Sequence, residues 1–173
     1  MRIILVSDLT KPYSKGPVDG ELHPDYKKIR QKIPSGIDYL VCGGYNTGSA
    51  TIANLLALDF ALNVSVDSRL GDIEKLNEKL NSLQHLKKQR FQKKIAHQET
   101  LSLCMYHLQE YIHRVKKLKP RNVLMVMNEF GCQLLLTYAL GISTDAIPSF
   151  NVNAGSVIML DIHDMSSMNK IHF

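Results

Sequence analysis

The sequence predicts an α/β fold in three layers, α/β/α, with helices on both faces of a mostly parallel sheet. Short apolar runs rich in β-branched residues recur at residues 2–6, 37–42, 123–127 and 157–162. Segments with helical spacing of apolar residues separate them, and this alternation is typical of parallel βαβ units. A length of 173 residues suits one domain spanning 1–173.

The first half of the chain begins with a buried strand at residues 2–6, which leads into a Pro- and Gly-rich loop that reaches Gly20. A short helix is expected from Pro24. The second strand, 37–42, is broken by two glycines, and an Ala- and Leu-rich helix follows over about 47–62. Strand, glycine turn and helix in this order predict the first parallel unit of the sheet.

The second half contains a helical insert at about 72–119, which lacks both Gly and Pro. We expect a break in it near His97. The strand at 123–127 is followed by a helix that stops at Gly141, since glycine favours the left-handed conformation that ends helices. The polar tail, 165–173, is expected to fray.

The composition favours a globular protein that acts outside membranes. Hydrophobic residues make up 45% of the chain, and no apolar run approaches the ~20 residues that a membrane helix needs. The first residues lack the features of a signal peptide, so a cytoplasmic location is expected. Three cysteines without metal-ligand spacing predict buried reduced thiols, and we expect neither a metal site nor a cofactor.

Several blocks of the chain resemble the histidine phosphatase superfamily, whose fold is phosphoglycerate-mutase-like. The opening strand is similar to the first strand of that family, which continues with Arg-His-Gly where this chain has Ser7-Asp8-Leu9. Residues 43–53 resemble the second block, in which the second phosphate-binding arginine falls on Gly48. Residues 150–160 resemble the closing strand. The resemblance implies a phosphoglycerate-mutase-like domain over nearly the whole chain.

Two later blocks complete the resemblance. Gln98-Glu99-Thr100 resembles the Gly-Glu-Ser that begins a helix in the family, so Glu99 is the one acidic site residue retained. Residues 123–142 resemble the strand and helix that carry the second catalytic histidine, and here that position is Asn128. Glu129 replaces the glycine that follows. By this resemblance the degenerate catalytic positions are Ser7, Asp8, Gly48, Glu99 and Asn128.

The resemblance implies that the family's chemistry has been lost. In the family a histidine attacks phosphorus while two arginines and the second histidine hold the phosphoryl oxygens, and none of these four groups remains. Positioning and electrostatic stabilisation supply most of the catalysis of phosphoryl transfer. Asp8, Glu99 and Glu129 would instead make the site acidic, and each like-charge contact at ~4 Å would cost about 4 kcal/mol at an effective dielectric near 20.

Three alternatives keep a ligand or an activity at this site. Asp8 could be an aspartyl nucleophile with a divalent metal, or it could join the other oxygen-bearing residues in holding a hard cation. Residues 43–49 follow a strand and open a helix, so their backbone could cradle an anion, although the lysine of a P-loop is missing. We favour a turn capped by Asn46 or Thr47. The expected ligand-binding residues are Asp8, Asn46, Thr47, Glu99, Asn128 and Glu129.

The chain has a formal net charge of +5, and its basic residues are concentrated in the helical insert. The expected partner-binding residues are Lys87, Lys88, Arg90, Lys93 and Lys94. Clustered cations attract an acidic protein surface or nucleic acid in a salt-dependent way, and we rank a protein partner above nucleic acid because no base-reading motif is present. The stripe Ile73, Leu76, Leu80 and Leu83 could pack on the domain or on a second copy, as in a homodimer.

The preferred functional hypothesis is a catalytically inactive protein, a pseudo-phosphatase that binds a small ligand or a protein partner and acts as a binding or regulatory module. The alternative is a divergent phosphatase or hydrolase that uses Asp8 in the same cleft, with a divalent metal. Phosphatase assays with and without metals would separate the two.

Overall fold

The computed structural model describes residues 1–8, 24–43, 47–84, 90–162 and 170–172. Six strands form one sheet in the order β3-β2-β4-β1-β5-β6. Their bounds are Arg2–Ser7 (β1), Tyr39–Cys42 (β2), Val64–Val66 (β3), Asn122–Met127 (β4), Val157–Asp161 (β5) and Lys170–His172 (β6). Strands β1 to β4 pair in parallel, whereas β5 and β6 are antiparallel to their neighbours. The predicted mostly parallel sheet is therefore confirmed.

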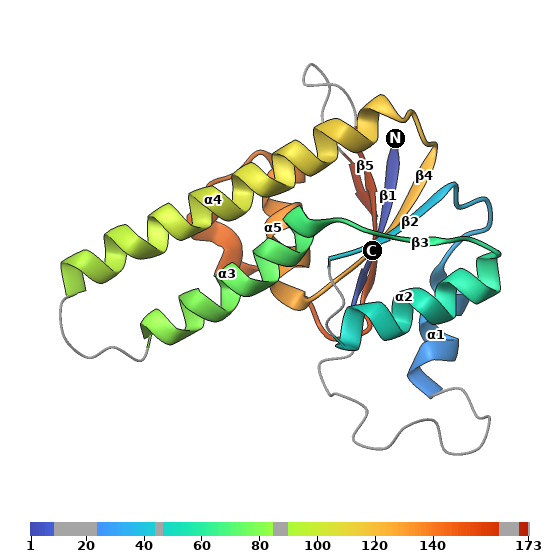
Figure 1. Cartoon of the computed structure of the whole chain (residues 1–173), viewed down its shortest axis with the longest axis horizontal. Coiled ribbons are helices and arrows are strands. Elements are labelled where there is room, and N and C mark those ends of the chain that lie inside the picture. The colour runs from blue at the N-terminus through green and yellow to red at the C-terminus, as the bar shows by residue number, and fades with distance from the viewer. Residues whose placement is uncertain (9–23, 44–46, 85–89, 163–169, 173) are drawn as a thin grey trace.

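Helices cover both faces of this sheet (Figure 1). Helices α1 (Pro24–Lys32) and α2 (Thr47–Phe60) pack on one face. Helices α3 (Ser68–Gln84), α4 (Arg90–Lys117) and α5 (Glu129–Leu140) pack on the other, and a 3-10 helix, η1 (Thr144–Ser149), follows α5. The predicted three-layer α/β/α architecture is confirmed.

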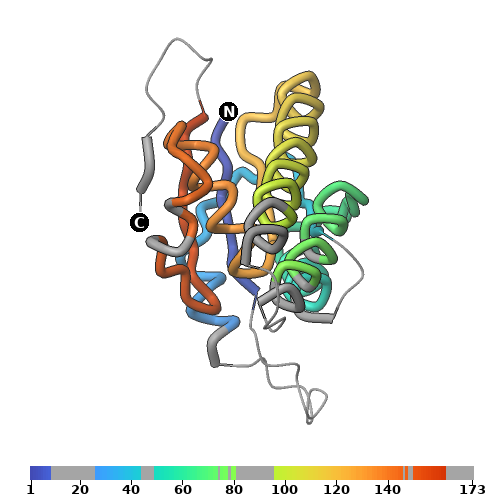
Figure 2. Tube along the Cα trace, turned by 90° about the vertical axis from the view of Figure 1, so that its left-hand side faces the viewer, coloured from blue at the N-terminus to red at the C-terminus, as the bar shows by residue number. Residues whose placement is uncertain are grey.

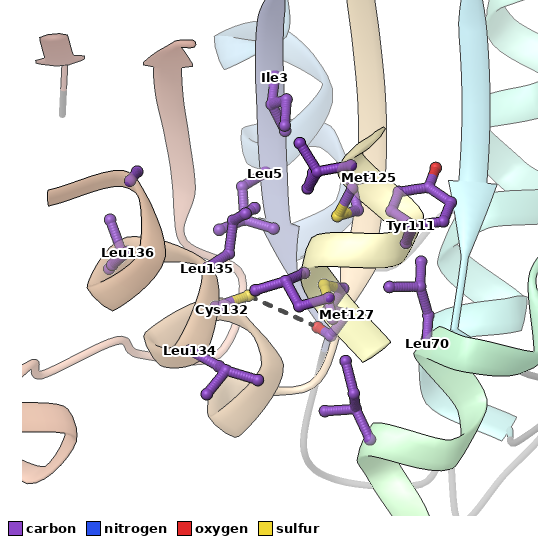
Figure 3. Close-up of a cluster of buried hydrophobic side chains, with 14 of the residues drawn as sticks. Ile3, Leu5, Leu70, Tyr111, Met125, Met127, Cys132, Leu134, Leu135 and Leu136 are labelled. Carbon is purple, nitrogen blue, oxygen red and sulfur yellow. Dashed lines mark hydrogen bonds between the residues drawn. The ribbon is translucent and has the colours of Figure 1, made fainter. Parts of the chain in front are cut away.

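Strand β1 shows how the sequence divides the core into two parts. Side chains alternate between the faces of a strand. Ile3 and Leu5 pack with α3, α4 and α5, whereas Ile4 and Val6 pack with α1 and α2. Figure 3 shows the first of these clusters, where Ile3 and Leu5 face the leucines of α5. The same alternation continues to Ser7, the last residue of the strand, and decides which way its side chain points.

The helical insert differs from the prediction in where it is interrupted. Helix α4 runs without a break from Arg90 to Lys117, so the expected break near His97 is wrong. Helices α3 and α4 lie side by side in both views (Figures 1 and 2). In α3, Ile73 and Leu80 are buried in the core of their own domain. These two positions of the apolar stripe are therefore already covered.

The ends of the described elements correct one prediction and confirm others. Residues Lys170–His172 pair with β5 as strand β6, which the sequence did not predict. Gly141 ends α5 with a φ of 65°, in the left-handed conformation expected there. All three cysteines are buried and none is in a disulfide, as predicted. Within the described residues, no helix is both long and apolar enough to cross a membrane.

Candidate functional site at the ends of β1 and β4

The candidate site is built on two neighbouring parallel strands that end at the same level. Ser7 of β1 is in register with Met127 of β4, so the residues that follow, Asp8 and Asn128, come next to each other at the carboxyl edge of the sheet. The backbone N–H of Asp8 donates to the carbonyl of Met127 over 2.8 Å. This edge is where open α/β sheets bind their ligands.

The side chain of Asp8 is tied to the beginning of α2. Ser49 is 1% exposed, and its hydroxyl donates a 2.9 Å hydrogen bond to Asp8 Oδ2. The other carboxylate oxygen, Oδ1, is buried and has no hydrogen-bond partner among the described residues. Asp8 thus uses one oxygen to join two elements and leaves one oxygen available for a ligand or a proton.

Ser7 points to the opposite face of the sheet, toward α5. Its side chain is 1% exposed, and its hydroxyl lies beside the Cys132 thiol at a geometry short of a regular hydrogen bond. The Ser7 backbone pairs with the loop before β5, since its N–H donates to Ser156 O and its carbonyl accepts from Gly155 N. Position 7 is therefore enclosed on the α5 side and by the neighbouring strand.

Asn128 serves as the N-cap of α5. Its side-chain oxygen accepts a 2.7 Å hydrogen bond from the backbone N–H of Gly131, which satisfies one of the unpaired donors of the first helical turn. A Cβ on Gly131 would lie 3.2 Å from Asn128 Oδ1 and 2.5 Å from Met127 Cε. The glycine thus lets the cap approach closely, and Asn128 has a structural role that needs no ligand.

Within the described residues, two carboxyl groups, those of Asp8 and Glu129, lie close enough at this edge to act on each other. Burial and the nearby Glu129 carboxylate raise the pKa of Asp8 above its ordinary value, although the Ser49 hydrogen bond acts against them. Burial also raises the pKa of the Cys132 thiol, with Asp8 and Glu129 adding to the effect. None of the ion pairs found among the described residues involves Asp8 or Glu129.

Only some of the other residues predicted to bind a ligand lie near Asp8 and Asn128. Gly48 lies in α2 directly before Ser49. Thr47 begins that helix, but the structure does not describe its side chain. Asn46 lies outside the described residues. Glu99 is exposed in the middle of α4, not at a helix N-terminus, and no hydrogen bond or ion pair among the described residues joins it to Asp8 or Asn128.

The structure does not describe the side chains of the predicted partner-binding residues. Lys87 and Lys88 lie outside the described residues. Arg90, Lys93 and Lys94 belong to the first turns of α4, but their side chains are not described. Their role stays a prediction. In the same described ranges, no group of three or more His, Cys, Asp or Glu residues converges as metal ligands would.

Sequence reasoning missed two residues that shape the site. Ser49 was part of a block matched to the resembled family, but a serine in a helix gives no sign that it bonds to Asp8. Cys132 follows Asn128 by one helical turn, and this spacing could have placed it next to the end of β1. Both are found only when the register of β1 and β4 is combined with the positions of α2 and α5.

Comparisons with known proteins identify the fold. No family model matches the chain, and no curated protein matches it in sequence. Solved structures do match. A candidate alpha-ribazole-5′-P phosphatase from Escherichia coli superposes with a TM-score of 0.66 at 16% identity, covering 99% of this chain and 94% of that chain.

Two further structures agree with this match. The mycobacterial glucosyl-3-phosphoglycerate phosphatase Rv2419c gives a TM-score of 0.60 at 12% identity, covering 99% of this chain and 95% of its own. A mutant phosphoserine phosphatase from Entamoeba histolytica, in complex with phosphoserine, gives 0.62 at 12% identity, with coverages of 98% and 94%. These neighbours are members of the histidine phosphatase superfamily. The chain therefore has the phosphoglycerate-mutase-like fold of these phosphatases, as the resemblance of its blocks predicted.

Proposed function

We propose that this chain is a binding or regulatory module on a phosphatase fold, without phosphoryl-transfer activity of its own. The observation that carries the proposal is the hydrogen bonding of Asp8 and Asn128, the two residues that directly follow β1 and β4. Asp8 and Asn128 stand where the resembled family has its two catalytic histidines, and each is engaged in a hydrogen bond within the fold. Neither is a cation that could hold a phosphoryl group.

The charge of the site supports the same proposal. Phosphoryl transfer needs positive groups around the transferred phosphoryl oxygens. Here Asp8 and Glu129 act on each other as like charges, and no ion pair in the described ranges brings a lysine or arginine to either. A phosphate monoester at this place would meet two carboxyl groups. We keep the cytoplasmic location as part of the proposal.

The second candidate is a divergent hydrolase in which Asp8 is the nucleophile and a divalent metal supplies the missing positive charge. The buried Oδ1 atom favours it, because this oxygen has no partner among the described residues. The direction of the Asp8 pKa weakens it, since a carboxyl nucleophile must be ionised and burial favours its neutral form. We therefore rank this candidate second.

Turnover of p-nitrophenyl phosphate by the purified chain, with and without Mg²⁺ or Mn²⁺, tests the proposal. We expect the same background rate in every condition, and the same rate in Asp8→Asn. Asp145→Asn is the matched control, because Asp145 is an exposed carboxylate of η1 and its substitution changes the net charge equally. A metal-dependent rate that Asp8→Asn abolishes and Asp145→Asn retains would establish the hydrolase instead.

A further inference from the structure

A second polar cluster lies at the carboxyl edge of the sheet, at the end of β3. Asp67 follows Val66, the last residue of β3, and its backbone N–H donates to Cys42 O, at the end of β2, over 3.5 Å. The strand order places β3 and β2 on the far side of β4 from β1. The cluster is thus on the edge where α/β sheets bind ligands, but at different strands from Asp8.

Two guanidinium groups converge on the one carboxylate of this cluster. Arg69 binds Asp67 through two side-chain bonds, Nε to Oδ1 at 2.8 Å and Nη2 to Oδ2 at 2.7 Å. Arg114, from α4, brings Nη1 to within 3.4 Å of the same Oδ2. Asp67 is 8% exposed, so both arginines are held at a nearly buried carboxylate.

The two guanidinium groups of the cluster carry one more charge than Asp67 neutralises. Glu110, an exposed carboxylate of α4, also acts on Arg69 through space and brings the formal sum of the four groups to zero, so the cluster offers hydrogen-bond donors rather than a net positive charge. Each guanidinium has five N–H donors in a planar fork. Arg114 commits only one nitrogen to Asp67, and 67% of its side chain is exposed. Donors of Arg114 therefore face solvent beside Arg69.

A buried hydroxyl without a partner adjoins these arginines. Tyr111 of α4 is 1% exposed, and its hydroxyl has no hydrogen-bond partner among the described residues. Asp67, Arg69 and Arg114 all act on it electrostatically. Figure 3 shows this hydroxyl pointing away from Met127 and Leu70. A buried hydroxyl left without an acceptor is costly, so this donor is available to a ligand or to water.

We propose that Arg69 and Arg114 form a binding site for an oxyanion, a carboxylate or phosphoryl group, with the Tyr111 hydroxyl as a third donor. Planar guanidinium forks match the two oxygens of a carboxylate or phosphate. Asp67 holds Arg69 through two hydrogen bonds and Arg114 through one nitrogen, which leaves the other donors of Arg114 for a ligand. The site uses neither Asp8 nor Asn128, so it stands or fails independently of the proposed function. It would give the module an anionic ligand at β3.

Calorimetric titration of the whole chain with inorganic phosphate, and separately with acetate, at constant ionic strength tests the site and distinguishes the two oxyanions. We expect saturable binding that Arg114→Gln weakens about ten-fold or more, the effect of removing a charge-assisted hydrogen bond. Lys117→Gln is the matched control, because Lys117 is exposed on the same helix and its loss changes the net charge equally. Asp145→Asn, at an exposed carboxylate of η1, should leave the affinity unchanged.

Tyr111→Phe examines the third donor without altering the packing of the ring. It should weaken binding and leave the free protein folded, because the hydroxyl it removes has no partner in the described part of the chain. Unchanged affinity in Tyr111→Phe would remove the hydroxyl from the proposed site. The absence of saturable binding, or equal losses in Arg114→Gln and Lys117→Gln, would mean attraction by net charge alone and would overturn the proposal.

Discussion

Ser49 and Asp8 join the beginning of α2 to the end of β1 through a 2.9 Å hydrogen bond from the serine hydroxyl to Asp8 Oδ2. By the resemblance of the sequence blocks, position 8 is that of the attacking histidine. A histidine there would need a free ring nitrogen facing the substrate. Here the corresponding side chain is a partly buried carboxyl group that links two elements of the fold. Under the proposed function, this position makes a structural contact and does not act as a nucleophile.

The raised pKa of Asp8 predicts how Asp8→Asn changes stability with pH. A carboxyl group whose pKa is higher in the folded than in the unfolded protein contributes most favourably when protonated, and this contribution is lost as pH rises from the unfolded pKa, about 3.8, through the folded one. Asp8→Asn removes the ionisation. The variant should therefore unfold at higher urea concentration than the parent at pH 7, and the gap should close toward pH 3.8.

Asn128→Ala should destabilise the fold by about 1 kcal/mol, because it removes the N-cap of α5. Asn128→His, which restores the residue of the resembled family, should cost a similar amount. Asn128→Ser is the control, since serine is also a preferred N-cap. Urea unfolding followed by circular dichroism measures all three. Equal stability of the Ala and Ser variants would show that the cap contributes nothing.

Ser7→Arg should destabilise the fold severely, by about 3 kcal/mol or more, since it places a large charged group at an enclosed position. Ser7 is 1% exposed and lies beside Cys132. Ser7→Ala, which loses only a hydroxyl without a regular hydrogen bond, should be nearly neutral. A well-folded Ser7→Arg protein in thermal unfolding would mean that the site still has room for the family's arginine.

Asp67→Asn should destabilise the fold by about 1–3 kcal/mol at pH 7, because two arginines lose their carboxylate partner. Burial opposes ionisation of Asp67, but its hydrogen bonds and ion pairs with Arg69 and Arg114 lower its pKa overall. The stabilisation is present above the ordinary pKa of about 3.8 and is lost as pH falls through the lower folded value. The parent should therefore lose stability on acidification more steeply than Asp67→Asn; parallel curves would contradict this.

The fold could be predicted because its signals are local. Apolar runs marked the strands β1, β2, β4 and β5, and Gly141 marked the end of α5. The order of these elements and the blocks around Asp8 and Asn128 then indicated a phosphoglycerate-mutase-like sheet. Such features depend on residues that are close together in the chain, so they can be recognised in a single sequence.

The rest depended on contacts between distant residues. Residues 72–119 contain neither Gly nor Pro, so nothing in the sequence located the separation between α3 and α4, and Glu99 was expected at a helix start that lies in the middle of α4. The bonds from Ser49 to Asp8 and from Arg114 to Asp67 join residues 41 and 47 positions apart. Only the packing of α2 and α4 on the sheet creates them.

Covalent labelling of Asp8 shows most directly whether the residues that follow β1 and β4 take part in phosphoryl transfer. If Asp8 were a nucleophile, Oδ1 would attack phosphorus as the bond to the leaving oxygen breaks, and the acyl phosphate would add one phosphoryl group to the protein. Intact-mass spectrometry after incubation with p-nitrophenyl phosphate and Mg²⁺, quenched in acid, measures this addition. We expect an unchanged mass, because the proposed module transfers no phosphoryl group. A phosphoryl group mapped to Asp8, and absent in Asp8→Asn, would contradict it.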